Sequence, residues 1–396
     1  MFRTVTRILP PLGWIALLSA FILTALGLLS IYAGEAGPGL TPSQTFKQFG
    51  FLIVGIGGFG CMQVLGYRRI GRWAYALFGL TLVLLTLLVV AQRVSFAPFI
   101  EPRRDAYRWI ALGPVSFQVS EYTKIVYVLA LAAYLRFRTN YRALRGFLPP
   151  FILTLVPMAL ILKEPDLGTS ILLPPTLMAM LFVAGAKIRH LLFVVLLGAA
   201  AGPVFYFSPL MKEYQRERVR SLFRQDAADP DVHRGWRLNA GYQLSQSKIA
   251  IGSGRVFGQG FRGGAFFRQN LLPEEHNDFI FAVLGHQWGF VGVILVLLCY
   301  LGIIVAGLTI ASMTTDPLGR LLAVGVCAML IAQTLLNVGM TVGLMPVTGV
   351  SLPFASMGGS GLVANYLSLG LLVDVARRRP VSVAPKPFEF GQEEEE

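Results

Sequence analysis

The sequence predicts an all-α integral membrane protein of about ten transmembrane helices, and three observations favour that fold class. The chain of 396 residues is 55% hydrophobic, and only 14% of its residues are charged, about half the share usual in soluble domains. Its mean hydropathy is +0.63. Apolar runs long enough to cross a bilayer, about 20 residues each, recur along almost the whole chain.

Ten apolar runs are the expected spans, and they cover residues 11–33, 48–66, 72–92, 120–136, 146–162, 168–186, 189–208, 278–311, 319–343 and 360–376. The first run has the length of a signal peptide, but no small-residue cleavage site follows it, so we expect it to be retained. Cys61, Cys299 and Cys327 lie inside these runs. They are therefore interpreted as small buried hydrophobes and not as a disulfide or zinc framework.

Positive charge along the chain predicts the topology. An even number of spans places both termini on one side, and the loops assigned to that side hold most basic residues of the short loops, among them Arg68, Arg69, Arg136 and Arg138. Cytoplasmic loops carry the excess of Lys and Arg, so both termini are expected in the cytoplasm. The net charge of +13 is thus attributed to topology and not to nucleic-acid binding.

Residues 1–376 form the predicted membrane domain, and residues 377–396, which are proline-rich and end in glutamates, are expected as a disordered cytoplasmic tail. One long extracytoplasmic loop, 209–277, joins spans seven and eight. We expect it to begin with a helix in the interface plane and to contain re-entrant, irregular backbone at glycines 252–264, lining a cavity. These glycines lack the features of a phosphate loop or a dinucleotide fold. The basic excess of the loop indicates either an anionic ligand or ordinary solvated charge.

Several ionisable residues are predicted at one level of the membrane, near its outer face. Glu121 and Lys124 lie three apart on one helical face, either as a mutual pair or as the lining of a polar cavity for a substrate head group. In the turn 163–170, Asp166 is placed to cap the next helix, whose first turn holds Thr169. The residues expected at this level are Arg108, Glu121, Lys124, Lys163, Asp166, Lys248 and Asp278.

Asp278 stands at the start of a long apolar run. Its position alone suits an N-cap or an ionisable group placed for chemistry at the membrane surface, and the other charged groups at the same level favour the second interpretation. His276 and His286 flank it at a spacing that does not suit metal ligation. The sequence contains no H-E-x-x-H, C-x-x-C or G-x-S-x-G motif, which disfavours a zinc enzyme and a hydrolase triad.

Five stretches follow one another in a distinctive order: RWIALGPVSFQVSEYTK (108–124), KEPDLGTS (163–170), GYQLSQSKIAIGSG (241–254), LPEEHNDFIFAVL (272–284) and NVGMTVGLMPVTGVSLPFASMGGSG (337–361). With these stretches the chain resembles the SEDS family, the RodA/FtsW polytopic proteins that polymerise peptidoglycan from a lipid-linked precursor. The stretch SKIAIGSG is closer to the RodA pattern of cell elongation than to the FtsW pattern of division.

The resemblance implies a peptidoglycan glycosyltransferase of the bacterial cytoplasmic (inner) membrane, with its active face outside, that polymerises lipid II during elongation and shape maintenance. It implies a class B penicillin-binding protein transpeptidase as partner, contact with membrane lipids and no nucleic acid. It also implies metal assistance, with Mg or Mn as the candidates and no organic cofactor. Asp278 would be the catalytic acid, and Glu121, Lys124 and Asp166 would line a polar cavity.

The sequence departs from the family pattern at four places. Val119 stands where proline is usual, Glu164 where glutamine is common, and Asn277 where threonine is usual, while His286 and Gln287 replace an acidic pair. We expect the first two changes to be tolerated. The last removes negative charge within a few turns of Asp278, a change that could alter its pKa or metal binding.

Chain growth requires a sugar hydroxyl to attack the anomeric carbon of a second lipid-linked sugar and to expel a lipid pyrophosphate. Our hypothesis makes Asp278 the base and Arg108, Lys124 and Lys248 the pyrophosphate-stabilising cations. The alternatives are a flippase or transporter of the lipid-linked precursor, an FtsW-type division polymerase, and a scaffold that recruits an enzyme. The gathering of ionisable groups on the outer face and the lack of an internal repeat weigh against a transporter.

Overall fold

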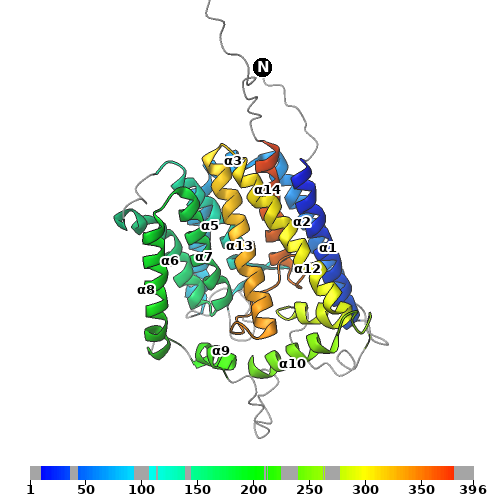
Figure 1. The fold of residues 1–396 in the computed structure, drawn as a ribbon. Coiled ribbons are helices and arrows are strands. Elements are labelled where there is room, and N and C mark those ends of the chain that lie inside the picture. Colours follow the sequence, from blue (N-terminus) through cyan, green and yellow to red (C-terminus); the bar gives the residue numbers. More distant parts are fainter. Residues whose placement is uncertain are drawn as a thin grey trace, which may run out of the picture.

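The computed structural model describes residues 10–35, 43–92, 107–112, 115–138, 144–208, 211, 213–223, 240–261, 263 and 277–378. Most of them belong to helices that stand side by side in a bundle (Figure 1). Each of the ten predicted spans coincides with a helix: α1 (Pro11–Glu35), α2 (Ser43–Leu65), α4 (Ala74–Ala91), α5 (Val119–Leu135), α6 (Leu148–Lys163), α7 (Leu167–Ala184), α8 (Ile188–Phe207), α12 (Ile280–Ser312), α13 (Pro317–Val342) and α14 (Gly359–Arg377).

The protein is a multi-pass membrane protein. Among the described residues, seven helices are long and apolar enough to cross a bilayer, namely α1, α2, α4, α7, α12, α13 and α14, and α6 and α8 are shorter apolar helices. The start of α1 and the end of α14 lie at one end of the bundle, together with the short helix α3 (Tyr67–Arg72). The helices α9 (Glu213–Phe223) and α10 (Ala240–Ser253) cross the opposite end (Figure 1). This arrangement agrees with termini on one face and the long loop on the other.

The ends of α13 show how local sequence sets a helix boundary. Asp316 occupies the N-cap and accepts from Gly319 N, and Pro317 takes the first helical position, where its missing N–H costs nothing. Gly343 ends the helix with φ +86°, a left-handed conformation that glycine adopts without strain. The chain then enters the irregular segment 343–358, which is called the α13–α14 segment below.

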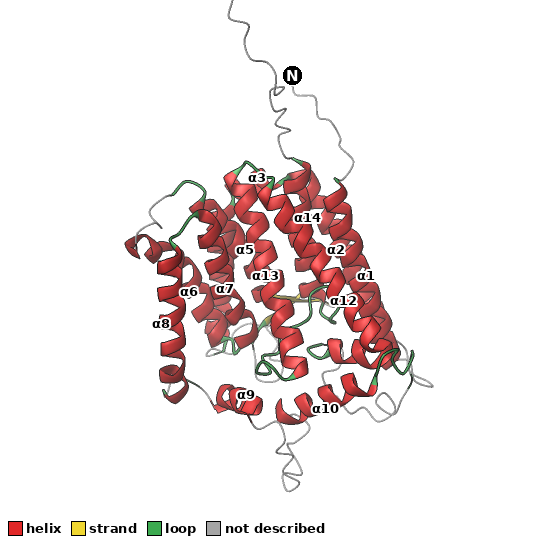
Figure 2. Cartoon of the chain, in the orientation of Figure 1, coloured by secondary structure: helices red, strands yellow, loops and turns green. Residues whose placement is uncertain are grey.

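The structure differs from the all-α expectation at a short hairpin, β1 (Trp109–Leu112) and β2 (Val115–Gln118), which pairs antiparallel with Trp109 opposite Gln118. Figure 2 shows its strands beside the helices of the bundle. The stretch WIALGPVSFQ is too short to span, and its Gly-Pro pair is a turn signal. A 3₁₀ turn, η2 (Leu144–Phe147), precedes α6.

The helix α12 is broken at Gly289, whose φ of 64° and ψ of −160° are not helical. The break removes intrahelical partners, and the glycine-rich segment supplies new ones through four backbone hydrogen bonds: Gln259 N to His286 O, Gly260 N to Gln287 O, Phe290 N to Arg255 O and Val291 N to Val256 O. A Cβ at Gly258 would lie 2.1 Å from Gln287 O, so only glycine permits this approach. The segment therefore packs on α12 with irregular backbone, and its re-entrant course and the cavity beside it stay predictions.

The bundle end that carries α3 is closed by polar contacts. Asp374 is fully buried and accepts from Tyr67 N at 2.8 Å and from Arg378 Nε at 2.7 Å. The Tyr67 hydroxyl donates to Asp316 at 2.8 Å. Because α14 runs to Arg377 and Arg378 binds Asp374, these two residues belong to the helix end and not to the predicted tail. The rest of that tail lies outside the described residues.

Candidate functional site

The carboxylate of Asp278 lies at the bundle end crossed by α9 and α10, just before α12. The capping position of α12 is Phe279, which makes no side-chain cap hydrogen bond, so Asp278 lies one residue before the cap. Asn337, on α13, donates through Nδ2 to Asp278 O at 2.8 Å and to Val350 O at 2.6 Å. One amide group thus ties the entrance of α12 to the α13–α14 segment.

A second tie fixes the preceding residue. The Ser356 hydroxyl donates to Asn277 O at 2.5 Å and accepts from Leu352 N at 2.7 Å. Asn277, which stands where the SEDS pattern has threonine, therefore contributes its backbone to this anchor. The position of the Asp278 carboxylate is consequently set by backbone contacts on both sides of its own peptide unit.

Arg218, on α9 in the long loop, also contacts the α13–α14 segment. It donates through Nη1 to Thr348 O at 2.7 Å. A Cβ on Gly349 would lie 3.3 Å from Asp278 Oδ2 and 3.8 Å from each terminal nitrogen of Arg218, so both charged groups border one point of the α13–α14 segment. The sequence pattern does not single out Arg218, because a run of charges on an amphipathic helix does not indicate which residue turns inward.

Glu121 and Lys124 form the predicted pair at the start of α5. Their charged atoms are 2.9 Å apart, and both residues are buried, at 8% and 4% exposed. Lys124 Nζ also donates to Gln333 Oε1 at 3.0 Å, and Gln333 Nε2 donates to Ser351 O at 2.9 Å. Gln333 lies one turn before Asn337 on α13. The pair is thereby connected to the segment that holds Asp278.

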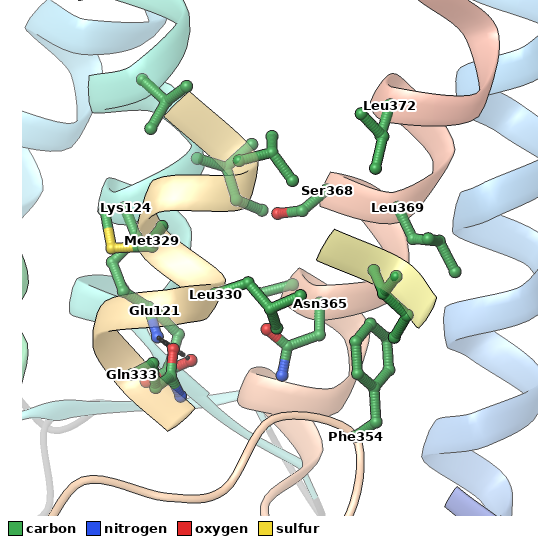
Figure 3. Close-up of a pocket in the computed structure, with 15 residues that line it drawn as sticks. Glu121, Lys124, Met329, Leu330, Gln333, Phe354, Asn365, Ser368, Leu369 and Leu372 are labelled. Atoms are coloured by element: carbon green, nitrogen blue, oxygen red, sulfur yellow. Dashed lines mark hydrogen bonds and ion pairs between the residues drawn. The ribbon is translucent and has the colours of Figure 1, made fainter. Parts of the chain in front are cut away.

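The pair also lines a small cavity between α5, α13 and α14 (Figure 3). Its polar lining comprises Glu121, Lys124, Gln333, Asn365 and Ser368. The cavity volume of about 40 Å³ accommodates a few water molecules and is far below the size of a pocket for a ligand, roughly 300 Å³ or more. Glu121 and Lys124 therefore form a mutual pair and also line a polar cavity, the two alternatives predicted from the sequence, although a sugar head group does not fit this cavity.

Asp166 caps α7, as its spacing from Thr169 predicted. Its carboxylate accepts from Thr169 N at 3.1 Å, from the Thr169 hydroxyl at 2.9 Å and from the Ser120 hydroxyl at 3.0 Å. Beside it, a Cβ on Gly168 would lie 2.8 Å from a Val350 methyl and 3.1 Å from Thr348 O. The cap thus seats the start of α7 directly against the α13–α14 segment, and glycine is needed for the close approach.

Arg108 holds the turn between α6 and α7. Its Nε donates to Glu164 O at 2.8 Å and its Nη2 donates to Pro165 O. The Glu164 side chain is fully buried, and neither carboxyl oxygen has a hydrogen-bond partner in the described structure. Burial, with a smaller contribution from the charge of Asp166, raises the pKa of Glu164 from 4.5 to about 9, although Arg108 acts in the opposite direction. Glu164 is therefore neutral at pH 7, like the glutamine common in the SEDS pattern.

The remaining predicted residues lie less centrally. Lys163 is exposed at the end of α6, and Lys248 is half-buried on α10, beside Ser247, whose hydroxyl donates to Thr341 O at 2.8 Å. His276 lies outside the described residues. His286 contacts the Ser253 hydroxyl at 2.6 Å and Gly263 O at 3.1 Å.

The donor set for a metal ion does not assemble in the part of the chain that the structure describes, because no three His, Cys, Asp or Glu side chains converge there. The charged group described beside Asp278 at Gly349 is a guanidinium, which cannot ligate a cation. We therefore derive no step through a metal, and the expectation of Mg or Mn stays a prediction.

Residues 13–380 match the FtsW/RodA/SpoVE family model, described as a cell cycle protein. The chain is 33% identical to the peptidoglycan glycosyltransferase MrdB of Escherichia coli K12 over 371 residues, which cover 94% of each chain. It is 32% identical to the stage V sporulation protein E of Bacillus subtilis over 366 residues, covering 90% of this chain and 94% of that protein.

Two solved structures resemble the fold. A chain from work entitled "Structural coordination of polymerization and crosslinking by a peptidoglycan synthase complex" matches with a TM-score of 0.75 and 31% identity, covering 92% of this chain and 97% of that one. The rod shape determining protein RodA of Thermus thermophilus matches with a TM-score of 0.66 and 28% identity at the same coverage. The similarity extends over almost the full length of each protein.

Proposed function

This chain belongs to the FtsW/RodA/SpoVE family, and from that premise we propose that it is a peptidoglycan glycosyltransferase that polymerises lipid II into glycan strands during cell elongation. The near-complete coverage of MrdB supports the activity, and the likeness to RodA supports the elongation role. Matches to relatives named FtsW keep division-type polymerisation as the alternative role of the same chemistry.

The observation that carries the proposal is the position of Asp278. It lies at the bundle end crossed by α9 and α10, anchored by its own backbone to Asn337, with the guanidinium of Arg218 bordering the same point. We assign this end to the extracytoplasmic face of the bacterial cytoplasmic membrane, because the arginine-rich loops belong to the opposite end. An anionic lipid-linked sugar in the outer leaflet would meet the base and the cation together.

The chemistry requires a base for the attacking sugar hydroxyl and positive charge for the departing pyrophosphate. Asp278 accepts the hydroxyl proton as the new bond to the anomeric carbon forms and the bond to the pyrophosphate oxygen breaks. Arg218 supplies positive charge beside that carboxylate, and Lys248 remains a further candidate for the pyrophosphate. The geometry gives Arg108 and Lys124 supporting roles, because Arg108 holds the α6–α7 turn and Lys124 is paired with Glu121.

The partner in the proposal is a class B penicillin-binding protein transpeptidase. Support comes from the similar chain in a peptidoglycan synthase complex, whose title joins polymerisation with crosslinking. A polymerase that delivers strands at the outer face would place its product within reach of such an enzyme.

The test is reconstitution of the purified chain, with and without the transpeptidase, on labelled lipid-linked disaccharide precursor, with glycan length followed on a gel. Wild type should form polymer. Asp278→Asn should lose activity on the order of 100-fold to 10,000-fold while its unfolding transition stays that of wild type. Precursor crossing vesicle membranes without any polymer would replace the proposal with a transporter. Full activity of the Asn variant would remove Asp278 from the chemistry.

A further inference from the structure

An open cleft lies at the bundle end opposite to Asp278, between α3, the start of α4 and the end of α5. Its volume is about 470 Å³, and its lining includes Arg72, Tyr75, Tyr134, Arg136 and Arg138. Three arginines and two tyrosines therefore line one space, which has the size of a pocket for a small ligand.

The three arginines lack acidic partners within the described structure, where none of the ion pairs includes Arg72, Arg136 or Arg138. Arg136 Nε is a buried donor with no hydrogen-bond acceptor in the same part of the chain. Two acids described at this end of the bundle are engaged elsewhere, because Asp316 binds Tyr67 and Asp374 binds Arg378. The cleft thus concentrates uncompensated positive charge.

Aromatic rings hold two of these guanidinium groups in place. The Arg136 guanidinium carbon lies 4.1 Å from the centre of the Phe137 ring, and that of Arg138 lies 5.7 Å from the centre of the Tyr134 ring. Cation–π contacts leave the N–H edge of a guanidinium available to an anion. The planar N–H fork of an arginine matches the geometry of phosphate oxygens better than a mobile lysine would.

The depth of the cleft in the membrane follows from its neighbours. Trp73 and Phe137, next to these arginines in sequence, are 67% and 77% exposed, and exposed aromatic rings gather at the level of the lipid headgroups. Basic pockets between spanning helices on the cytoplasmic side are suited to anionic headgroups. A water-soluble anion would gain nothing from such rings.

We propose that this arginine cleft binds the phosphate-bearing headgroup of an anionic phospholipid in the leaflet at that end of the bundle. The phosphate oxygens accept from the arginine forks and the tyrosine hydroxyls, and the acyl chains lie along the lipid-facing side of α4. The site is independent of the glycosyltransferase proposal, since it shares no residue with the Asp278 end.

The test uses the full chain in nanodiscs of phosphatidylcholine containing phosphatidylglycerol or cardiolipin, with lipids retained after mild extraction counted by native mass spectrometry. Arg136→Gln/Arg138→Gln should retain roughly tenfold less anionic lipid than wild type. The matched control is Lys187→Gln/Arg189→Gln, which removes two charges from exposed positions at the start of α8, outside the cleft, and should retain lipid like wild type.

Equal retention by the two double variants would overturn the proposal, because diffuse surface charge would then account for the binding. An excess of inorganic phosphate distinguishes the source of the anion: displacement of the lipid by phosphate alone would show a site for free phosphate and overturn the assignment. Should the cleft double variant fail to fold, Arg72→Gln, at an exposed position, should still lower retention severalfold, and no change would again refute the site.

Discussion

Replacement of Glu164 by glutamine tests whether a buried, protonated carboxyl occupies the turn between α6 and α7. In the described structure this side chain is fully buried without a hydrogen-bond partner, and its pKa is raised to about 9. In the unfolded chain the carboxyl ionises near 4.5. Because the folded state holds the proton more tightly, stability is greatest below the unfolded pKa and is lost as the pH rises toward 9.

The size of the effect follows from the two pKa values. Between the two pKa values, each pH unit lowers the free energy of unfolding by about 1.4 kcal/mol. At pH 7 the free energy of unfolding is therefore lower by about 3 kcal/mol than below the unfolded pKa. Glutamine has no proton to lose on unfolding. We therefore expect Glu164→Gln to be more stable than wild type at neutral pH by up to this amount and to be insensitive to pH where wild type is not.

The assay is denaturant-induced unfolding in mixed micelles, followed by tryptophan fluorescence at several values between about pH 5 and about pH 9. Glu213→Gln is the control, since Glu213 is exposed and pairs with Arg216 and Arg220 at the surface; exposed pairs contribute about 1 kcal/mol or less. Parallel profiles for wild type and Glu164→Gln would refute the reasoning and mean that Glu164 is ionised in the folded protein.

Three further predictions concern the neighbourhood of Asp278. Arg218→Gln should lower polymerisation on the order of a hundredfold, with Arg218→Lys retaining part of the rate; equal activity of both variants and wild type in the gel assay would exclude a role for this charge. Lys124→Ala should destabilise the protein by about 3–5 kcal/mol by leaving Glu121 buried and unpaired, measured by unfolding, whereas Glu121→Gln/Lys124→Met should recover most of the loss. Gly349→Ala should reduce polymerisation, because the added methyl lies 3.3 Å from the Asp278 carboxylate at a residue with φ +76°; unchanged glycan synthesis would show that the carboxylate tolerates displacement.

Hydropathy was sufficient to locate the long apolar helices of this chain, because a spanning helix needs only a long apolar run. Local spacing also located two contacts within the site: Asp166 caps α7 three residues before Thr169, and Glu121 pairs with Lys124 three residues on. Both contacts form within one helical turn. Both contacts can therefore be predicted from the sequence without knowledge of the tertiary structure.

The contacts that position Asp278 could not be found in this way. Asn337 reaches Asp278 O across 59 residues of sequence, and Arg218 reaches Thr348 O across 130. Neither pairing has a periodicity or a spacing signal. The burial of Glu164 is hidden for the same reason, since a glutamate in a polar turn between two spans is expected to face water.

The departure at His286 and Gln287 shows how a change of charge can be absorbed by packing. Gln287 accepts from the Ser30 hydroxyl of α1 at 2.8 Å, and His286 lies between the Ser253 hydroxyl and Gly263 O. Both side chains tie the first half of α12 to other segments. We infer that the loss of two acidic groups was compatible with function because these positions serve anchoring here.

The break in α12 also anchors the glycine-rich segment, because the two segments pair their backbone groups. Four backbone groups around Gly289 are paired with residues 255–260, and unpaired backbone groups are costly in a membrane. Phe261, just beyond these residues, stacks on Tyr32 of α1 with ring centres 6.2 Å apart, so α1 and α12 hold the segment from two sides. Residues 255–260 are therefore bonded to the first half of α12, whose start lies two residues after Asp278.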